Sequence, residues 1–324
     1  ATTQIYTLSL HDALPILHGW FSLYLPNYAT NKVSISGHEN LLMPWTPPEL
    51  ARALSFADTR HVSVNIDQVP TYFDQPSRAT TANFQFDWAG GLQSETYRLL
   101  IRTGINDEPY VRTLKDGTPI GLSGIIVNKM NVPLYDVTVV WITDEKNTPA
   151  LHAKDDDGNT LPWIKMSESG KPLNLAWSWR LAQWEPEEQL SLDAFIPKTE
   201  SLIKLGMDKR YQQEKRWDTY STGSAMPQQE RIRRLEMLAL YSHLKPPVYQ
   251  KHAGKTQSPS SHNIIRQGGR RLDFASWFGR PCIIVMGFVK DAALPISVRV
   301  DGEEINPSSG MTMVRWVYPL GTAP

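Results

Sequence analysis

Two stretches near the middle of the chain, residues 124–128 and 135–142, have the apolar, β-branched character of strands, and apolar and polar residues alternate along the second. In the second stretch every odd-numbered residue is apolar, whereas Asp136 and Thr138 are polar. This pattern predicts a strand with one face in the core and the other mostly exposed to water. The short polar connection at residues 129–133 predicts that the two strands form a hairpin.

The same alternation recurs at residues 173–181 and 190–194. Four strands within about 75 residues are typical of a β-sandwich, and we expect a domain of this kind over residues 120–198. Trp177 falls on the apolar side of its strand, so we expect its ring in the core. Further alternating stretches between residues 263 and 320 are expected to continue this domain.

Residues 17–119 predict a first β domain. Apolar residues alternate with polar ones around Phe21, Val64 and Phe86, which is typical of half-buried strands. Asp116-Gly117 is a turn signal and marks the expected boundary. The expected fold is therefore mainly β, with two β-sandwich-like domains and a helical insertion with a flexible connection at residues 199–262.

The insertion contains one predicted helix, residues 227–244, which begins with Pro227 and consists of good helix formers. On a helical wheel with about 100° per residue, one group of apolar residues is opposed by a second group that includes Leu240 and Tyr241. An apolar surface on both sides predicts burial between two surfaces. These are either the two domains or one domain and a protein partner, and Leu240 and Tyr241 are the candidate contact residues.

Composition narrows the range of partners. The chain has 324 residues, of which 41% are hydrophobic, and its 33 basic residues equal its 33 acidic residues in number. A formal charge of zero gives no dominant field, so we expect neither a nucleic-acid partner nor direct insertion into a membrane. The one cysteine, Cys282, cannot form an intrachain disulfide, and its apolar neighbours predict a buried side chain.

Short matches to catalytic and metal-binding motifs fail on their neighbours. Residues 254–256 read Gly-Lys-Thr, but Tyr249 stands where a phosphate loop needs glycine. Residues 201–204 fit a Ser-x-x-Lys pattern without the elements that accompany it in acyl-serine enzymes. Residues 155–159 concentrate carboxylates, yet an EF-hand alignment loses both key ligands. We therefore expect no catalytic residue, no metal site and no cofactor.

The eleven tryptophans leave a carbohydrate-binding alternative open. Trp141, Trp177 and Trp179 lie on the apolar side of their strands, which favours core packing. Trp163 and Trp184 have no such assignment and are the candidate platforms for a sugar. Binding by these rings would require their exposure in a groove, whereas a hydrolase, the third alternative, would require converging carboxylates or a Ser-His pair.

Three stretches carry a family resemblance: residues 64–70, residues 131–137 and residues 311–320. They resemble segments of large, uncharacterised bacterial envelope proteins, in which a membrane anchor precedes several extracytoplasmic β domains. The resemblance covers most of residues 17–320 and implies an extracytoplasmic location, in the periplasm or cell envelope. It implies no functional residues. The function expected from the sequence is thus a non-catalytic interaction or structural module of a membrane-associated protein.

The first residues differ in origin from the rest. Residues 4–16 resemble the in-frame translation of a sequencing-adapter oligonucleotide, and we treat residues 1–16 as an artefact that is not native. We expect the natural N-terminus, with any signal peptide or membrane anchor, to lie upstream of Leu17.

An artefact of this kind has no selected contacts with the core, so removing residues 1–16 should leave stability unchanged. A chain that begins at Leu17 is expected to melt at the same temperature as the full chain in differential scanning calorimetry. A melting temperature lower by several degrees would contradict this expectation.

Overall fold

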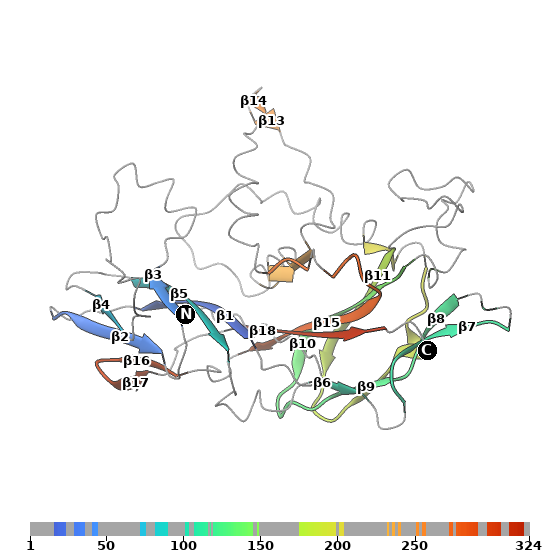
Figure 1. Cartoon of the computed structure of the whole chain (residues 1–324), viewed down its shortest axis with the longest axis horizontal. Helices are drawn as coiled ribbons and strands as arrows, with labels where there is room; N and C mark the ends of the chain where they lie inside the picture. The colour runs from blue at the N-terminus through green and yellow to red at the C-terminus, as the bar shows by residue number, and fades with distance from the viewer. Residues whose placement is uncertain are drawn as a thin grey trace.

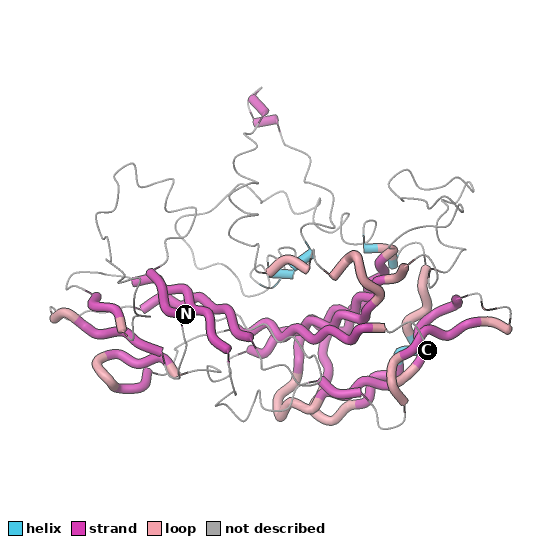
Figure 2. The backbone as a smooth tube through the Cα atoms, in the orientation of Figure 1, coloured by secondary structure: helices cyan, strands magenta, loops and turns pink. Residues whose placement is uncertain are grey.

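The fold is taken from a computed structural model, in which strands predominate (Figure 2). Its description covers the following residues: 16–23, 29–35, 41–44, 72–75, 82–89, 101–103, 107–115, 117, 119–144, 148, 175–198, 201–203, 232, 235–236, 239–240, 251–252, 255–256, 272–274, 277–290, 297–305 and 311–320. The prediction of a mainly β protein is confirmed. The two sandwich-like domains and the helical insertion remain predictions.

The central element is a four-stranded antiparallel sheet in the order β11-β10-β15-β18 (Figure 1). Its strands are β11 (Ala176–Trp184), β10 (Leu134–Ile142), β15 (Cys282–Lys290) and β18 (Met311–Pro319). Because β15 and β18 come from the last part of the chain, strands far apart in sequence are neighbours in this sheet.

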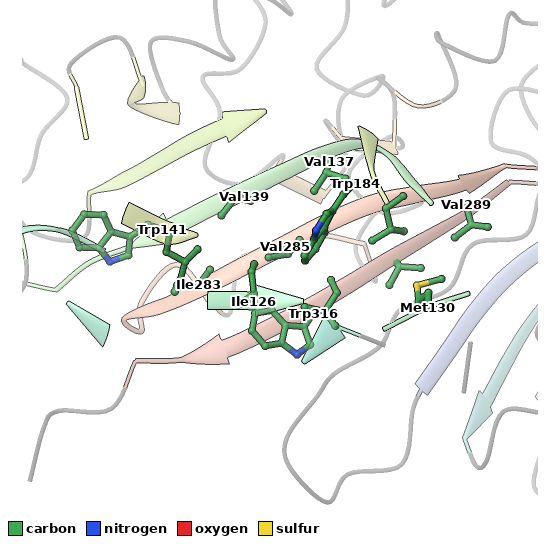
Figure 3. Close-up of a cluster of buried hydrophobic side chains, with 14 of the residues drawn as sticks. Ile126, Met130, Val137, Val139, Trp141, Trp184, Ile283, Val285, Val289 and Trp316 are labelled. Atoms are coloured by element: carbon green, nitrogen blue, oxygen red, sulfur yellow. The ribbon is translucent and has the colours of Figure 1, made fainter. Parts of the chain in front are cut away.

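A three-stranded sheet, β12-β9-β6, shares a core with the central sheet. It consists of β12 (Gln189–Ser191), β9 (Ile125–Asn128) and β6 (Ile101–Thr103). Figure 3 shows the shared cluster, in which Ile126 of β9 packs with residues of β10 and β15. Trp177 is fully buried in the same cluster, which confirms its predicted core position.

Four smaller sheets and one 3-10 turn complete the described part of the chain. Strands β2, β4, β16 and β17 lie at one end of the molecule, and β7 and β8 lie at the other (Figure 1). The remaining elements are β1 (Ile16–Leu23), β2 (Asn31–Ile35), β3 (Leu41–Pro44), β4 (Phe73–Gln75), β5 (Ala82–Ala89), β7 (Tyr110–Thr113), β8 (Pro119–Ser123), η3 (Leu192–Ala194), β13 (Lys251–His252), β14 (Lys255–Thr256), β16 (Val298–Val300) and β17 (Glu303–Ile305).

The predicted hairpin of residues 124–128 and 135–142 is wrong. β9 pairs with β12 and β6, whereas β10 pairs with β11 and β15, so residues 129–133 connect two different sheets. The buried Asn128 side chain holds this connection, because its Nδ2 donates to the carbonyls of Val132 at 3.3 Å and Trp184 at 3.1 Å. Its Oδ1 also accepts from the Met130 amide at 3.1 Å.

The predicted exposed face of β10 is wrong as well. Thr138, Val140 and Ile142 are fully buried, and the two apolar residues belong to a second core cluster on that face of the sheet. Leu272 and Phe274 pack in this cluster too. Alternation therefore failed to predict exposure here, because the central sheet is covered on both faces.

Arg315 of β18 is a charged residue that is buried beside the second core cluster. Its guanidinium lies 4.2 Å from the centroid of the Phe274 ring and donates to the Leu272 carbonyl. Only 8% of the residue is exposed. A cation over an aromatic ring, with a carbonyl acceptor, offsets part of the cost of removing the charge from water.

Five residues of the predicted helix are described and have helical backbone: Ile232, Leu235, Glu236, Ala239 and Leu240. All five are buried, and the four apolar ones lie in the second core cluster. The three later apolar residues lie 3, 7 and 8 positions after Ile232, which is the spacing of a single apolar stripe. The wheel interpretation that put Leu240 on an opposite surface is therefore corrected, although no complete helix is delimited over residues 227–244.

The predicted domain boundaries stay a prediction. β16, from residues 263–320, pairs with β2 of the predicted first domain, and β6 of that domain pairs with β9. Ile16, the last residue of the adapter-like stretch, is the first residue of β1 and pairs with Ala89.

Gly124 and Gly117 form a matched pair for testing backbone constraint, since both have positive φ, +112° and +82°. A Cβ on Gly124 would lie 2.7 Å from the Glu108 carbonyl oxygen, whereas one on Gly117 would meet nothing within 4 Å. Gly117→Ala should lower the free energy of unfolding by about 1 to 2 kcal/mol, for the left-handed conformation alone. Gly124→Ala should cost about 1 to 3 kcal/mol more, for the backbone overlap. Equal losses in urea unfolding would show that the 107–109 segment moves freely.

Candidate functional site

The described residues offer no reaction centre of a familiar kind. Among them, no group of three or more His, Cys, Asp and Glu side chains is arranged to hold a metal ion. Within this same part of the chain, no helix combines the length and apolar character needed to cross a membrane.

β11 is one of the two edge strands of the central sheet, with β10 as its neighbour on the inner side. On the outer side, Leu202 forms an isolated antiparallel bridge with Trp177. Leu202 and Ile203 are both buried, one in each core cluster. The chain itself thus lies against the start of the β11 edge and extends both cores past it.

The segment after η3 packs beside the same half of β11. The Trp179 Nε1 donates to the Ile196 carbonyl at 3.2 Å, and the Trp179 and Phe195 ring centroids are 5.3 Å apart. Trp177 and Trp179, in the first half of β11, are therefore contacted by Leu202, Ile196 and Phe195.

The second half of the strand, residues 180–183, differs. No described residue bridges its outer side, and we call it the open edge. Arg180, Ala182 and Gln183 are exposed, and Leu181 is half-buried. An edge strand presents unpaired backbone N–H and C=O groups, which are a template for pairing with another extended chain.

The charge of Arg180 does not protect the open edge from pairing with another strand, because its guanidinium is paired with carboxylates of neighbouring residues. Its Nη2 lies 3.4 Å from Glu236 Oε2 and 4.0 Å from Asp136 Oδ1. Glu236 is itself buried and accepts from Thr138 Oγ1 at 2.8 Å. Asp136 has a positive φ of 47° at an irregularity between β10 and β15, where one extra residue of β10 fits opposite β15.

An acidic turn follows the open edge. Glu185 accepts from Gln183 Nε2 at 2.5 Å, and the Glu185 amide donates to Glu188 Oε2 at 2.8 Å. Glu187 forms an ion pair with Lys129 at 2.5 Å. All three glutamates are exposed, so they set the charge that an approaching chain meets at the Trp184 end of β11.

The candidate residues predicted from the sequence do not meet in one site. Trp184 is 1% exposed, and its Nε1 donates to the Glu188 carbonyl at 3.0 Å, so its ring offers no face to a sugar. Leu240 is fully buried against the protein's own sheet. Trp163 and Tyr241 lie outside the described residues.

Sequence reasoning missed the open edge. Residues 180–183 read as an ordinary strand, and the order of strands in the sheet decides which strand has a free side. The polar residues Arg180 and Gln183 near the end of a strand are the one signal that could have indicated an edge.

Comparisons with known proteins give no family. No protein-family model and no curated protein sequence matches the chain. Among solved structures, it is similar to the yeast delta-COP-I mu-homology domain complexed with a Dsl1 WxWxV peptide, with 8% identity, 97% of this chain and 93% of that chain covered, and a TM-score of 0.29. The yeast delta-COP-I mu-homology domain without the peptide gives 8% identity, coverages of 97% and 92%, and a TM-score of 0.28. TM-scores this low do not establish a shared fold.

Cys282 is buried, as predicted, and its Sγ lies 3.9 Å from the Trp277 carbonyl. Burial raises the pKa of this thiol from 9.0 to about 12. Since the folded pKa lies above the unfolded one, the thiol's contribution to stability is complete below pH 9 and is lost as the pH rises to about 12.

Alkaline unfolding should therefore distinguish the parent chain from Cys282→Ala. Between about pH 8 and pH 10.5, the free energy of unfolding of the parent should fall by about 2 kcal/mol more than that of the variant, because only the parent's unfolded thiol ionises. Urea unfolding measures the difference, and groups common to both chains cancel. Equal losses would show that the thiolate is accommodated in the fold.

Proposed function

We propose that this protein is a non-catalytic interaction module that binds an extended segment of a partner protein along the open edge of β11. The observation that supports this is the division of one edge strand into two halves: the first is contacted by the chain's own Ile196 and Leu202, and the second, residues 180–183, has no described residue bridged to its outer side. An added strand gains main-chain hydrogen bonds from the edge and selectivity from its alternate side chains.

The length of the open edge limits the affinity. In an antiparallel ladder every second residue directs its N–H and C=O to a given side, so residues 180–183 offer two such residues and about four hydrogen bonds. At about 0.5 to 1.5 kcal/mol net for each bond, four bonds contribute about 2 to 6 kcal/mol, so the backbone alone supports weak binding, with a Kd between about 40 μM and about 30 mM. A module of this kind suits transient contacts or several contacts in parallel.

We also propose the location and finer architecture expected from the sequence: two β-sandwich-like domains with a helical insertion, on the extracytoplasmic side of a membrane-associated envelope protein. The alternation of residues 17–198 and the resemblance of residues 64–70 and 311–320 to envelope proteins support this. The buried Trp184 gives no support to carbohydrate binding.

A proline scan of two adjacent residues tests the binding mode. Successive amides of a strand point to opposite sides. Of the two variants Leu181→Pro and Ala182→Pro, one therefore loses an amide that points away from β10 and keeps its hydrogen bonds to β10, whereas the other loses an amide that points toward β10. The variant that keeps these bonds is identified by an unchanged melting temperature. Extended peptides are first selected against the parent chain from a display library. They should bind the folded proline variant at least about tenfold more weakly than the parent, a loss of about 1.4 kcal/mol in binding free energy.

Amide chemical shifts locate the binding independently of the substitutions. Peptides selected against the parent should perturb residues 180–183, and Gln183→Ala, which keeps the backbone amide, should bind like the parent. Shifts confined to another surface, such as the exposed Tyr110, Leu114 and Ile196, would overturn the proposal. So would unchanged peptide affinity in the folded proline variant.

A further inference from the structure

The charged residues around the open edge indicate the sign of the charge that its ligand needs. The carboxylates on the acidic turn or in contact with Arg180 are those of Asp136, Glu185, Glu187, Glu188 and Glu236. The described cations that contact these groups, or the β10 residue opposite Gln183, are Arg180, Lys129 and Lys290. Each cation is already engaged: Arg180 with Glu236 and Asp136, Lys129 with Glu187, and Lys290 with the ring of Tyr135, whose centroid lies 4.0 Å from its Nζ.

Glu185 and Glu188 remain without a cation among the ion pairs of the described residues. Both are exposed and are held in place at the end of β11, because the Glu185 carboxylate accepts from Gln183 and the Glu188 carboxylate accepts from the Glu185 amide. Held carboxylates lose less conformational entropy on binding a cation than mobile ones.

The side chains on the faces of β11 set a second requirement for the ligand, an apolar residue. Residues of an added strand alternate between the two faces of a sheet. Leu181 is half-buried and packs against the first core cluster, the one that contains Trp177 and Leu202. A residue of the added strand beside Leu181 therefore gains most if it is apolar.

The chain's own residues indicate direction. Leu202 pairs with β11 in the antiparallel sense, and its side chain joins the same core cluster as Leu181. A ligand with the same sense meets the Glu185 end of β11 first and the Leu181 position four residues later. Its basic residue therefore precedes its apolar residue.

From this arrangement we infer that the ligand of the open edge is an extended, basic protein segment, antiparallel to β11, with lysine or arginine about four residues before an apolar side chain. The inference rests on the proposed function and specifies its partner. The basic residue lies against Glu185 and Glu188, and the apolar residue lies beside Leu181.

Four synthetic ten-residue peptides in a serine and threonine background serve as probes. The first has lysine at position 3 and valine at position 7, and the second has the two exchanged. The third has glutamate in place of lysine, and the fourth has serine there. Binding is measured by titration of amide shifts at low and high salt, with the full chain.

The first peptide is expected to bind about three- to tenfold more tightly than the serine peptide, the range for one or two exposed ion pairs, and the glutamate peptide more weakly still. The preference should vanish at high salt, because exposed charges are screened. It should also vanish in the double variant Glu185→Gln with Glu188→Gln. The matched control, Glu303→Gln with Glu304→Gln on the exposed β17, should keep it.

The outcomes separate this inference from the proposed function. If all four peptides shift residues 180–183 with equal affinity, the edge binds strands but the basic ligand is overturned. If the exchanged peptide binds best, the direction is overturned. If no peptide shifts these residues, or if the shifts follow protein concentration alone because two copies pair, the proposed partner itself is overturned.

Discussion

Burial of the central sheet on both faces is the constraint on which the rest of the described structure depends. Odd-numbered residues of β10 face one core cluster and even-numbered residues from Thr138 onward face the other side. Neither cluster is formed by the four strands of the central sheet alone. The first also includes Ile126 of β9 and Leu202. The second also includes residues outside the sheet: Ile203, Ile232, Leu235, Ala239, Leu240, Leu272 and Phe274. On the second face, two polar side chains are hydrogen-bonded inside the protein, Thr138 to Glu236 and Arg315 to the Leu272 carbonyl.

How far the sequence predicts this fold depends on the range of the interaction. The hairpin of β16 and β17 is a local structure: Asp301-Gly302 is a sequence typical of tight turns, and it joins the two strands with φ of +54° and +88°. Burial of Trp177 also followed from alternation within one strand. The partners of a strand are not local. Residues 124–128 and 135–142 have the spacing of a hairpin, yet the three hydrogen bonds of the Asn128 side chain fix a crossing between sheets instead.

The candidate site also depends on both local and long-range interactions, and only the local ones can be predicted from the sequence. Trp184 was singled out because its alternation was uncertain, and its position at the end of β11 put the ring inside the core. The open edge could not be predicted, because β11 becomes an edge strand only through the pairing of β10 with β15, more than a hundred residues further along the chain. The acidic turn is visible in the sequence as Glu185, Glu187 and Glu188, but its relation to that edge is not.

The attachment of β16 to β2 has a consequence for the order of folding during synthesis. The Lys32 amide donates to Asp301 Oδ1 at 2.7 Å and the Asp301 amide donates to the Lys32 carbonyl at 2.8 Å, so contacts separated by 269 positions complete this sheet. At a ribosomal rate of about 5 to 20 residues per second, β2 waits for more than about ten seconds before its partner emerges. During that time the backbone groups of β2 that later pair with β16 are left to water or to other chains, until β16 itself has been synthesised.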